Sequence, residues 1–240
     1  MSNPENYYFT PGTHAFVSEY LRLLRDAPTV ICISEFTLQQ MFEVLRRPGD
    51  RPTLVAHPGG DHIPVSESQP PLRPRFLRVG TMEARKHPVE IVSAFMAAVD
   101  DGLEADLEFI GSPSRVDVSI NLTVERAIDS GYPVAWRKTA TDADVADAMA
   151  TSTAFLSYGV EGYGIPVLEA IRRGLPVLFD GIQPSAELME GKGAMRFELV
   201  GARGSWQQAV AEVHGCGREL DSARVPQWDA FASAVVGVMT

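Results

Sequence analysis

The stretch Phe155–Gly181, FLSYGVEGYGIPVLEAIRRGLPVLFDG, predicts a strand, a loop, a helix, a turn and a second strand. An apolar run that ends at Ser157 precedes a loop whose two glycines relieve the steric limits on the backbone. Pro166 suits the first turn of a helix, apolar residues at helical spacing follow, and Gly174 is expected to stop that helix. Residues 175–179 form the next apolar strand, so the stretch indicates an α/β fold.

The loop and helix of this stretch also predict a chemistry. A helix that begins behind a glycine-bearing loop points free N–H groups and a partial positive charge at the strand ends, where phosphate is the natural guest. Glu161 lies on the loop and Glu169 lies eight residues later within the helix. Two carboxylates would repel a phosphate, but they suit the hydroxyl groups of a sugar and of a ribose. The combination predicts a site for a nucleotide sugar.

Ten consecutive residues carry a family resemblance. Glu161 to Ala170, EGYGIPVLEA, resemble without departure the donor signature E-G-[FY]-G-[LIV]-P-[VI]-[LI]-E-A of the retaining GT-B glycosyltransferases of family 4, also called glycosyl transferases group 1. The resemblance implies transfer of a hexose such as mannose from a GDP- or UDP-linked donor to a glycan or lipid-linked acceptor, as in polysaccharide biosynthesis. It implies a catalytic role for Glu161 and donor contacts from Gly162, Tyr163, Gly164, Ile165, Val167, Leu168 and Glu169. An ordinary strand-to-helix turn with surface glutamates is the alternative.

Composition sets broad limits on the function. The 240 residues are 45% hydrophobic and 22% charged, as in soluble globular proteins, and no apolar run approaches the roughly 20 residues of a membrane span. The polar N-terminus is not expected to be a signal peptide. A net charge of −10 argues against a nucleic-acid role. Cys32 and Cys216 have no metal or disulfide spacing, so they are expected to be small core residues of a cytoplasmic protein.

The first quarter of the chain predicts a short α/β unit. Residues 14–26 form an amphipathic helix, 29–33 and 53–56 form strands, and Ser34 or Thr37 caps the helix between them. The unit resembles the end of a family 4 N-terminal domain, so residues 1–60 are expected to be a remnant of the acceptor-side domain. Residues 61–74 hold four prolines and are expected to be linker.

Residues 75–225 predict the donor-binding domain. Strands alternate with helices and are expected at 76–80, 107–111, 132–136, 153–157, 176–179 and 194–199. This alternation predicts a doubly wound, parallel, six-stranded Rossmann-like sheet, and the resemblance implies the strand order 3-2-1-4-5-6. Asp142 is expected to cap a helix, and Trp206 and Trp228 to lie in the core. Residues 226–240 are expected to form a helix that crosses back to the N-terminal side.

A basic loop follows the first strand of this domain. In a doubly wound sheet it lies at the carboxyl edge beside the switch point, where ligands bind. Gly80 to Lys86, GTMEARK, resemble the family's loop, in which Arg85 and Lys86 are implied to neutralise the departing diphosphate. His87 replaces the usual Asn or Gly. A solvated basic pair is the alternative for Arg85 and Lys86.

Three further residues complete the implied donor site. Gly80, Gly111 and Arg137 end or follow the first three strands of the domain, although for Arg137 a solvated charge is the commoner role. Glu187 is expected to brace a loop rather than to touch the donor. The histidines have no ligand spacing, and the resemblance implies that no metal or cofactor is needed.

The missing parts of the family's N-terminal domain leave alternative functions open. The family's N-terminal glycine-rich loop and acceptor pocket are absent from these residues, so the chain is expected to be inactive alone. A partner chain or a cut-away domain is the open explanation, with self-association through residues 1–60 as a further expectation. A non-catalytic sugar-nucleotide-binding subunit is the alternative function. A nucleotide-dependent oxidoreductase is excluded, because GTMEARK is not the G-x-G-x-x-G that such a fold requires after its first strand.

Overall fold

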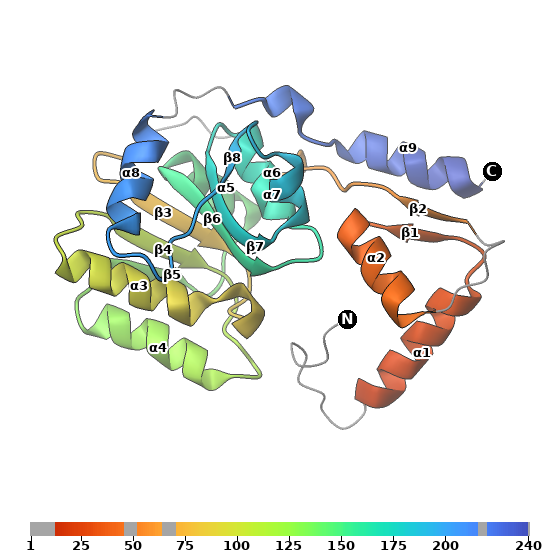
Figure 1. The fold of residues 1–240 in the computed structure, drawn as a ribbon, viewed down its shortest axis with the longest axis horizontal. Helices are drawn as coiled ribbons and strands as arrows, with labels where there is room; N and C mark the ends of the chain where they lie inside the picture. Colours follow the sequence, from red (N-terminus) through yellow and green to blue (C-terminus); the bar gives the residue numbers. More distant parts are fainter. Residues whose placement is uncertain (1–12, 46–51, 64–70, 216–219, 240) are drawn as a thin grey trace. The chain divides into compact units, whose positions relative to one another are not determined.

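The computed structural model describes residues 13–45, 52–63, 71–215 and 220–239 (Figure 1). The chain divides into two compact units, one of residues 1–59 together with 226–240 and one of residues 60–225. Half of the predicted linker, residues 64–70, and Cys216 lie outside the described residues. The assignment of the first unit to an acceptor-side domain stays a prediction.

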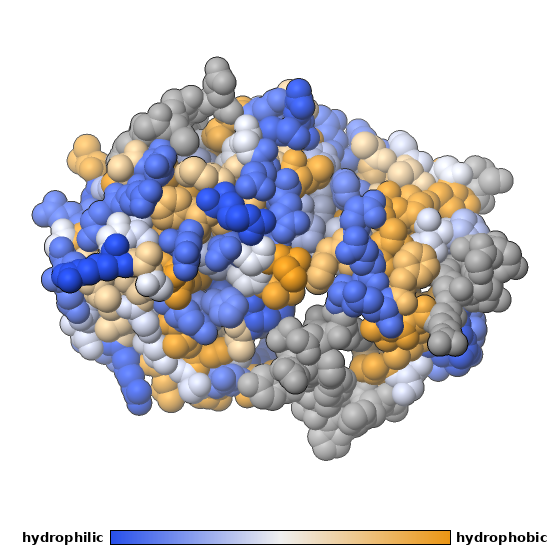
Figure 2. All heavy atoms as spheres, viewed as in Figure 1, coloured by the Kyte–Doolittle hydropathy of each residue, from blue (hydrophilic) through white to orange (hydrophobic). Residues whose placement is uncertain are grey.

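The first unit is a small α/β arrangement. Its elements are α1 (Thr13–Asp26), β1 (Val30–Cys32), α2 (Glu35–Val44), β2 (Thr53–Val55) and α9 (Trp228–Met239). The two strands are parallel, and Val30 pairs with Thr53. Val30, Cys32 and Met41 form its buried core, whereas hydrophobic residues also gather at the surface over α2, β1 and β2 (Figure 2). The buried cluster of this unit is therefore small, with partly buried hydrophobic residues packed against it.

The cap of α2 is Ser34. Its hydroxyl accepts the Thr37 N–H at 3.0 Å, and the Thr37 hydroxyl accepts the Ser34 N–H at 3.1 Å. This reciprocal box satisfies two of the N–H groups that a helix start leaves unpaired. Of the two predicted caps, the structure selects Ser34 and makes Thr37 its partner.

The second unit is built on one parallel sheet. Its strands are β3 (Arg75–Val79), β4 (Asp106–Ile110), β5 (Val134–Arg137), β6 (Ala154–Val160), β7 (Val177–Ile182) and β8 (Ala194–Arg196). Their order is β5-β4-β3-β6-β7-β8, and every neighbouring pair is parallel. This order is the predicted 3-2-1-4-5-6, so the predicted fold class is confirmed.

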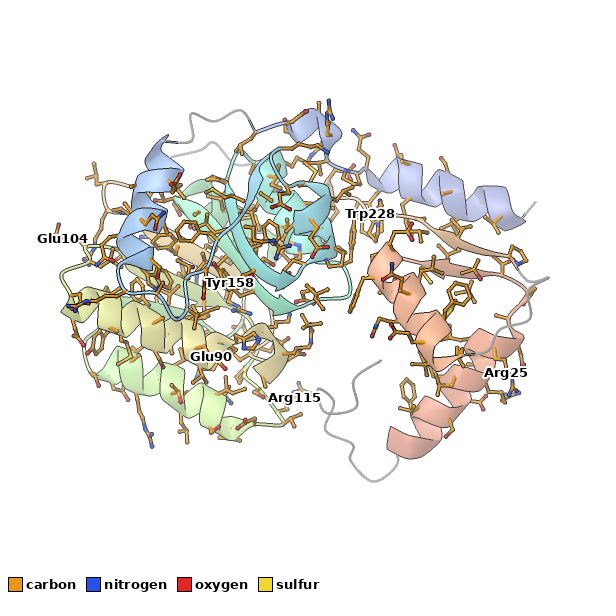
Figure 3. All side chains as sticks on the ribbon, in the orientation of Figure 1. Arg25, Glu90, Glu104, Arg115, Tyr158 and Trp228 are labelled. Atoms are coloured by element: carbon orange, nitrogen blue, oxygen red, sulfur yellow. The ribbon has the colours of Figure 1, made fainter. Side chains whose placement is uncertain are left out.

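Helices cover both faces of the sheet. One core joins the sheet to α3 (Pro88–Asp100), α4 (Val118–Asp129) and α8 (Ser205–Gly215). The other joins it to α5 (Asp142–Ala150), α6 (Ile165–Arg172) and α7 (Pro184–Leu188). Tyr158 of β6 belongs to the first core, and Glu90 stands on α3 (Figure 3). Two short 3-10 helices, η2 (Ala84–Lys86) and η3 (Ser222–Arg224), complete the described elements.

The two tryptophans differ from each other. Trp206 is 1% exposed and packs edge-on against Phe76 and Phe95, with ring centroids 5.1 and 5.0 Å away, as predicted for a core residue. Trp228 is only half-buried at the start of α9, where it packs on Phe231, so its predicted core position is wrong. Phe231 lies on the same helix as Trp228, and part of the indole stays exposed to solvent.

Several predicted boundaries are also wrong. β8 ends at Arg196 and not at residue 199, and β5 begins at Val134 and not at residue 132. β6 continues past Ser157 to Val160, and β7 continues to Ile182, because their pairing extends through Gly159 and Gly181. These polar and glycine positions break the apolar pattern from which the strand ends were predicted. The N-cap of α5 is Thr141, whose hydroxyl accepts the Asp144 N–H at 3.2 Å, and not Asp142.

Candidate functional site

The candidate site lies where the strand order of the sheet reverses, between β3 and β6. Neighbouring strands there lead into loops that turn to opposite faces, which leaves a crevice outside their carboxyl ends. The loop after β3 contains η2, and the loop after β6 leads through residues 161–164 into α6. The basic loop and the glutamate signature therefore meet at one edge of the sheet.

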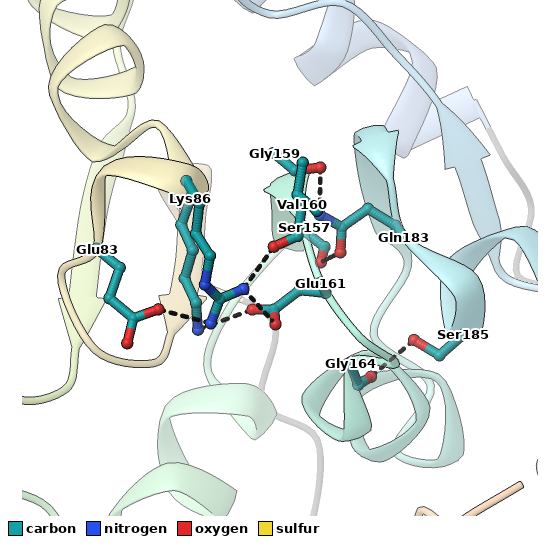
Figure 4. Close-up of polar contacts among 10 residues, drawn as sticks. Glu83, Lys86, Ser157, Gly159, Val160, Glu161, Gly164, Gln183 and Ser185 are labelled. Atoms are coloured by element: carbon teal, nitrogen blue, oxygen red, sulfur yellow. Dashed lines mark hydrogen bonds and ion pairs between the residues drawn. The ribbon is translucent and has the colours of Figure 1, made fainter. Parts of the chain in front are cut away.

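Arg85, Lys86 and Glu161 come together in a compact cluster, in which Lys86 lies beside Glu161 (Figure 4). The Glu161 carboxylate lies 2.7 Å from Lys86 Nζ with one oxygen and 2.8 Å from Arg85 Nη1 with the other. Arg85 also pairs with Glu83 at 2.6 Å and donates to the carbonyl of Val160. All three residues predicted as catalytic are thus brought into contact, across 75 residues of sequence.

The cluster is ionised and partly withdrawn from water. Burial by itself raises the pKa of Glu161, but Lys86 and Arg85 outweigh it and hold that pKa below its ordinary value. Burial opposes the charge of Arg85, and Glu161 and Glu83 still raise its pKa. The side chains of Arg85 and Lys86 are 19% and 13% exposed. The alternative of a solvated basic pair is therefore wrong.

The loops approach the strands so closely that side chains would not fit. A Cβ on Gly159 would lie 1.9 Å from the carbonyl oxygen of Arg85, and one on Gly111 would lie 2.1 Å from that of Gly80. Both glycines also have positive φ, 89° and 148°. Glycine at these positions lets η2 and its loop lie directly on the strand ends, which carries Arg85 to Glu161.

His87 occupies the one left-handed position taken by a residue other than glycine in the described chain, with φ 53° and ψ 41°. It ends η2 and begins α3. Asn and Gly are favoured in this conformation, because most side chains clash there with the backbone. The departure from the family's loop therefore leaves the turn intact but strained.

Residues beyond the predicted set hold the signature loop. Gly164, with φ 99°, is the N-cap of α6, and its carbonyl accepts the Ser185 hydroxyl at 2.7 Å. Gln183 is fully buried, accepts the Ser157 hydroxyl at 2.7 Å and donates to the Gly159 carbonyl at 3.1 Å. The only sequence signal for Gln183 and Ser185 was their place directly after a predicted strand. They fix the edge from which Glu161 projects.

Three residues predicted to contact a donor have buried side chains. Tyr163, Val167 and Leu168 are 3%, 1% and 0% exposed and belong to the core beneath α6. Burial also raises the pKa of Tyr163. A donor contact from Val167 or Leu168 would have to use the backbone. The N–H of Ile165, at the first turn of α6, makes no hydrogen bond with the described residues, as expected for a helix start.

Glu169 lies inside the unit with an unforeseen partner. Its side chain is 6% exposed, and Oε1 is 2.9 Å from Nε2 of His62. Burial raises the pKa of Glu169, and His62 and Arg173 oppose that shift. Arg173 donates to the carbonyls of Glu169, at 2.8 Å, and of Ile63. His62 was not predicted, because nothing in the local sequence marks a partner more than 100 residues away.

Arg137 is paired but keeps much of its side chain in solvent. Its Nε lies 2.6 Å from the carboxylate of Glu108, and its side chain is 40% exposed. The carbonyl of Gly111 accepts the Trp136 indole N–H at 2.9 Å, which ties the ends of β4 and β5 together. Glu187 accepts the Gln183 N–H at 3.3 Å, in agreement with a bracing role. Whether Gly111 and Arg137 contact a donor stays a prediction.

Within the ranges that the structure describes, no group of three or more His, Cys, Asp or Glu side chains is arranged to hold a metal ion. None of the helices described there is long and apolar enough to cross a membrane.

Sequence comparison relates the chain to mannosyltransferases. No known family profile matches it. It is 29% identical over 119 residues to the serotype-specific mannosyltransferase WbdA of Escherichia coli, a match that covers 49% of this chain and 14% of WbdA. It is 24% identical over 182 residues to the O-antigen chain mannosyltransferase B of Escherichia coli, covering 71% of this chain and 48% of that protein. The chain thus spans less than half the length of these curated relatives.

Solved structures share its fold. Sucrose-phosphate synthase from Thermosynechococcus elongatus superimposes with a TM-score of 0.73 at 16% identity, over 97% of this chain and 63% of that one. HepE from Anabaena, solved with UDP and glucose, gives a TM-score of 0.71 at 13% identity, over 99% of this chain and 69% of that one. The six-stranded parallel sheet described above is that of the C-terminal, Rossmann-like half of GT-B glycosyltransferases.

Proposed function

We propose that this chain carries the donor site of a retaining, metal-independent glycosyltransferase of family 4. The enzyme would transfer a hexose, with mannose as first candidate, from a GDP- or UDP-linked donor to a glycan or lipid-linked acceptor. The observation that carries the proposal is the convergence of Arg85, Lys86 and Glu161 at the switch point of the sheet. Two cations and a carboxylate at this edge match a donor that has an anionic diphosphate and a hydroxylated sugar.

The geometry supports a division of labour. Arg85 and Lys86 would take the diphosphate, Glu161 would face the sugar, and Glu169 would accept from the ribose. In the transfer, the bond between sugar C1 and the diphosphate oxygen breaks, and a bond from C1 to the acceptor oxygen forms. The proton of the acceptor hydroxyl passes to the departing diphosphate, and the nucleoside diphosphate leaves with it. Cations beside the leaving oxygen stabilise the charge that develops on it, which lowers the barrier.

The proposed family, sugar, nucleotide and independence of metal are each supported by a different observation. Family 4 and retention rest on the ten-residue signature at Glu161–Ala170. Mannose rests on the two mannosyltransferase relatives, and the nucleotide on the UDP in the HepE structure. Independence of metal rests on the cations of Arg85 and Lys86, which supply the charge that a divalent ion otherwise brings. A cytoplasmic location is kept as part of the proposal.

Calorimetric titration with GDP and with UDP, each with and without EDTA, tests the donor site. We expect binding of at least one nucleotide, unchanged by chelation. Binding that disappears with EDTA would contradict a metal-independent site. The Lys86→Ala variant should lose affinity, whereas Lys192→Ala should not, because Lys192 follows α7 outside the cluster and its ammonium donates to the Leu188 carbonyl, at 3.4 Å.

The two glutamates are separated by a second titration. Glu169→Ala should weaken GDP binding by roughly ten- to a hundredfold, the worth of a charged hydrogen bond to the ribose. Glu161→Ala should not weaken GDP binding, because Glu161 faces the sugar and its loss leaves Arg85 and Lys86 open to the diphosphate; it should reduce only the preference for the nucleotide sugar over the free nucleotide. Equal losses of GDP affinity in both variants would show that the roles are misassigned.

A further inference from the structure

Arg78, in the middle of β3, is a buried cation without a counterion. It is 5% exposed, its Nη1 is fully buried with no hydrogen-bond partner, and its guanidinium makes no ion pair with any residue that the structure describes. Burial lowers its pKa to about 10, which leaves it charged at neutral pH. A buried charge without a partner is costly, and native proteins retain such groups chiefly at functional sites.

The position of Arg78 connects it to the donor site. Gly80 directly follows β3, two residues after Arg78, and its N–H still donates to the Ile110 carbonyl of β4 at 2.8 Å. A Cβ on Gly80 would lie 3.0 Å from Lys86 Nζ, so that ammonium lies at the end of β3. Lys86 in turn holds Glu161. Arg78 therefore lies close to the cluster of Arg85, Lys86 and Glu161, and the charges of Arg85 and Glu161 act on it.

The charged and titratable groups around Arg78 come from four elements or loops. They are Arg85 of η2, Glu90 of α3, Tyr158 of β6 and Glu161 of the signature loop. Glu90 is half-exposed beside His87, and the Tyr158 hydroxyl donates to the carbonyl of Phe197 (Figure 3). Glu161 is the more buried of the two carboxylates, since its side chain is 21% exposed against 49% for Glu90, and it has the largest electrostatic effect on Arg78 after burial.

Donor binding would deprive Glu161 of its two cationic partners, and Arg78 could replace them. On the proposed function, the diphosphate needs the two cations that Glu161 occupies in the structure. A carboxylate that loses both partners while still largely buried would take up a proton, because low polarity disfavours its charged form. A nearby guanidinium with unused N–H donors offers an alternative partner.

We propose that Arg78 is a positioning residue that receives the carboxylate of Glu161 when the donor diphosphate takes Arg85 and Lys86 from it. This inference rests on the proposed function. The exchange keeps Glu161 ionised and fixed beside the sugar, and it frees Arg85 and Lys86 for phosphate. It also accounts for an arginine that is buried on the sheet without a partner in the donor-free protein.

The Arg78→Met variant separates this role from a structural one. Methionine fills the space without the charge, so the donor-free variant should be as stable as the wild type or more stable. Its affinity for GDP at pH 8 should fall by at least roughly tenfold, and binding should take up close to one proton per GDP. The affinity should recover as the pH is lowered from 8 to 6, whereas the wild type changes little. Arg78→Lys should restore part of the affinity at pH 8.

The measurement is calorimetric titration with GDP in two buffers of different ionisation enthalpy, with thermal melts of each variant. Arg75→Met is the matched control, because it makes the same substitution on the same strand but on the opposite face, and it should bind as the wild type does. In the double variant Arg78→Met/Glu161→Gln, the proton uptake should vanish, because no carboxylate remains to be protonated.

The outcomes distinguish this inference from the function on which it rests. If wild-type protein binds neither GDP nor UDP, the proposed function is wrong and the exchange falls with it. If the wild type binds GDP but Arg78→Met binds it equally well with no proton uptake, only the exchange is overturned. A lower melting temperature together with unchanged GDP binding would assign Arg78 a purely structural role and would likewise overturn it.

Discussion

His87 shows how one residue stores strain at the edge of the site. Its left-handed backbone is disfavoured by about 1–2 kcal/mol for residues with a Cβ. We predict that His87→Gly is more stable than His87→Ala by about 1 kcal/mol, because both variants remove the imidazole and only glycine removes the strain. Urea denaturation of the two variants measures the difference. Equal midpoints would mean that the turn relaxes when the side chain is lost.

Glu161 links the charged cluster to acid stability. Its pKa in the folded protein is lowered, so its stabilising contribution is present above the unfolded value of about 4.3 and is lost as the pH falls through the lower folded value. We predict that wild type exceeds Glu161→Gln in free energy of unfolding at pH 6, and that this difference shrinks toward pH 3. Urea melts across that range test it. As a control, Glu104→Gln, at an exposed carboxylate, should change the free energy of unfolding little at pH 6. If the difference between wild type and Glu161→Gln stayed constant from pH 6 to pH 3, the ion pairs would not be its cause.

At the scale of elements, the segment of residues 60–63, here called the strap, packs along α6. A Cβ on Gly60 would lie 2.5 Å from Cβ of Leu168, His62 binds Glu169, and Arg173 binds the Ile63 carbonyl. The strap therefore fixes the helix whose first turn faces the site, and with it the carboxylate of Glu169.

We predict that Gly60→Ala destabilises the second unit by about 2 kcal/mol, because the methyl group meets backbone and Cβ atoms that cannot turn away. The control is Gly237→Ala in α9, where a Cβ meets nothing within 4 Å and the better helix former should stabilise by about 0.5–1 kcal/mol. Denaturation followed by near-ultraviolet circular dichroism compares them. A stable Gly60→Ala protein would show that the strap moves freely on α6.

At the scale of the molecule, the first unit presents apolar surface. Phe16, Leu23 and Phe42 are 62%, 56% and 54% exposed, and β1 and β2 pair only with each other among the described residues. Unpaired strand edges and exposed apolar side chains favour association between chains. We predict that the 240-residue chain self-associates in light scattering and that Phe16→Glu combined with Leu23→Glu reduces its mass. A monomeric wild type would contradict this.

The same organisation sets an expectation for turnover. The described residues contain one six-stranded sheet and one two-stranded sheet, and positioning donor and acceptor together supplies roughly 7–11 kcal/mol in transfer reactions. We predict that this chain alone binds nucleotide but transfers labelled sugar far more slowly than an ordinary enzyme rate of about 10 s⁻¹. Transfer at that rate by a monomer would mean that the first unit builds a complete acceptor site.

The sequence determined the parts of this protein that depend on local pattern. Apolar periodicity predicted all six strands of the large sheet and most of the helices around it, and Pro166 and Gly174 stand where α6 begins and ends. The family signature singled out Glu161 and Glu169, and the basic loop singled out Arg85 and Lys86. Spacing of 2 and 3.6 residues, turn chemistry and short motifs are all readable within a window of a few residues.

Only the tertiary structure decided which of these groups meet. Glu161 pairs with residues 75 and 76 positions earlier, Glu169 pairs with His62, and Nη1 of Arg78 finds no hydrogen-bond partner among the described residues. β6 runs on to Val160 because β7 pairs with it, although glycine and polar residues interrupt the apolar pattern there. Ion pairs, burial and strand pairing depend on distances set by the packed sheet. A local sequence pattern holds no information on those distances. It could therefore identify the candidate site residues, but not the residues that they contact in the folded protein.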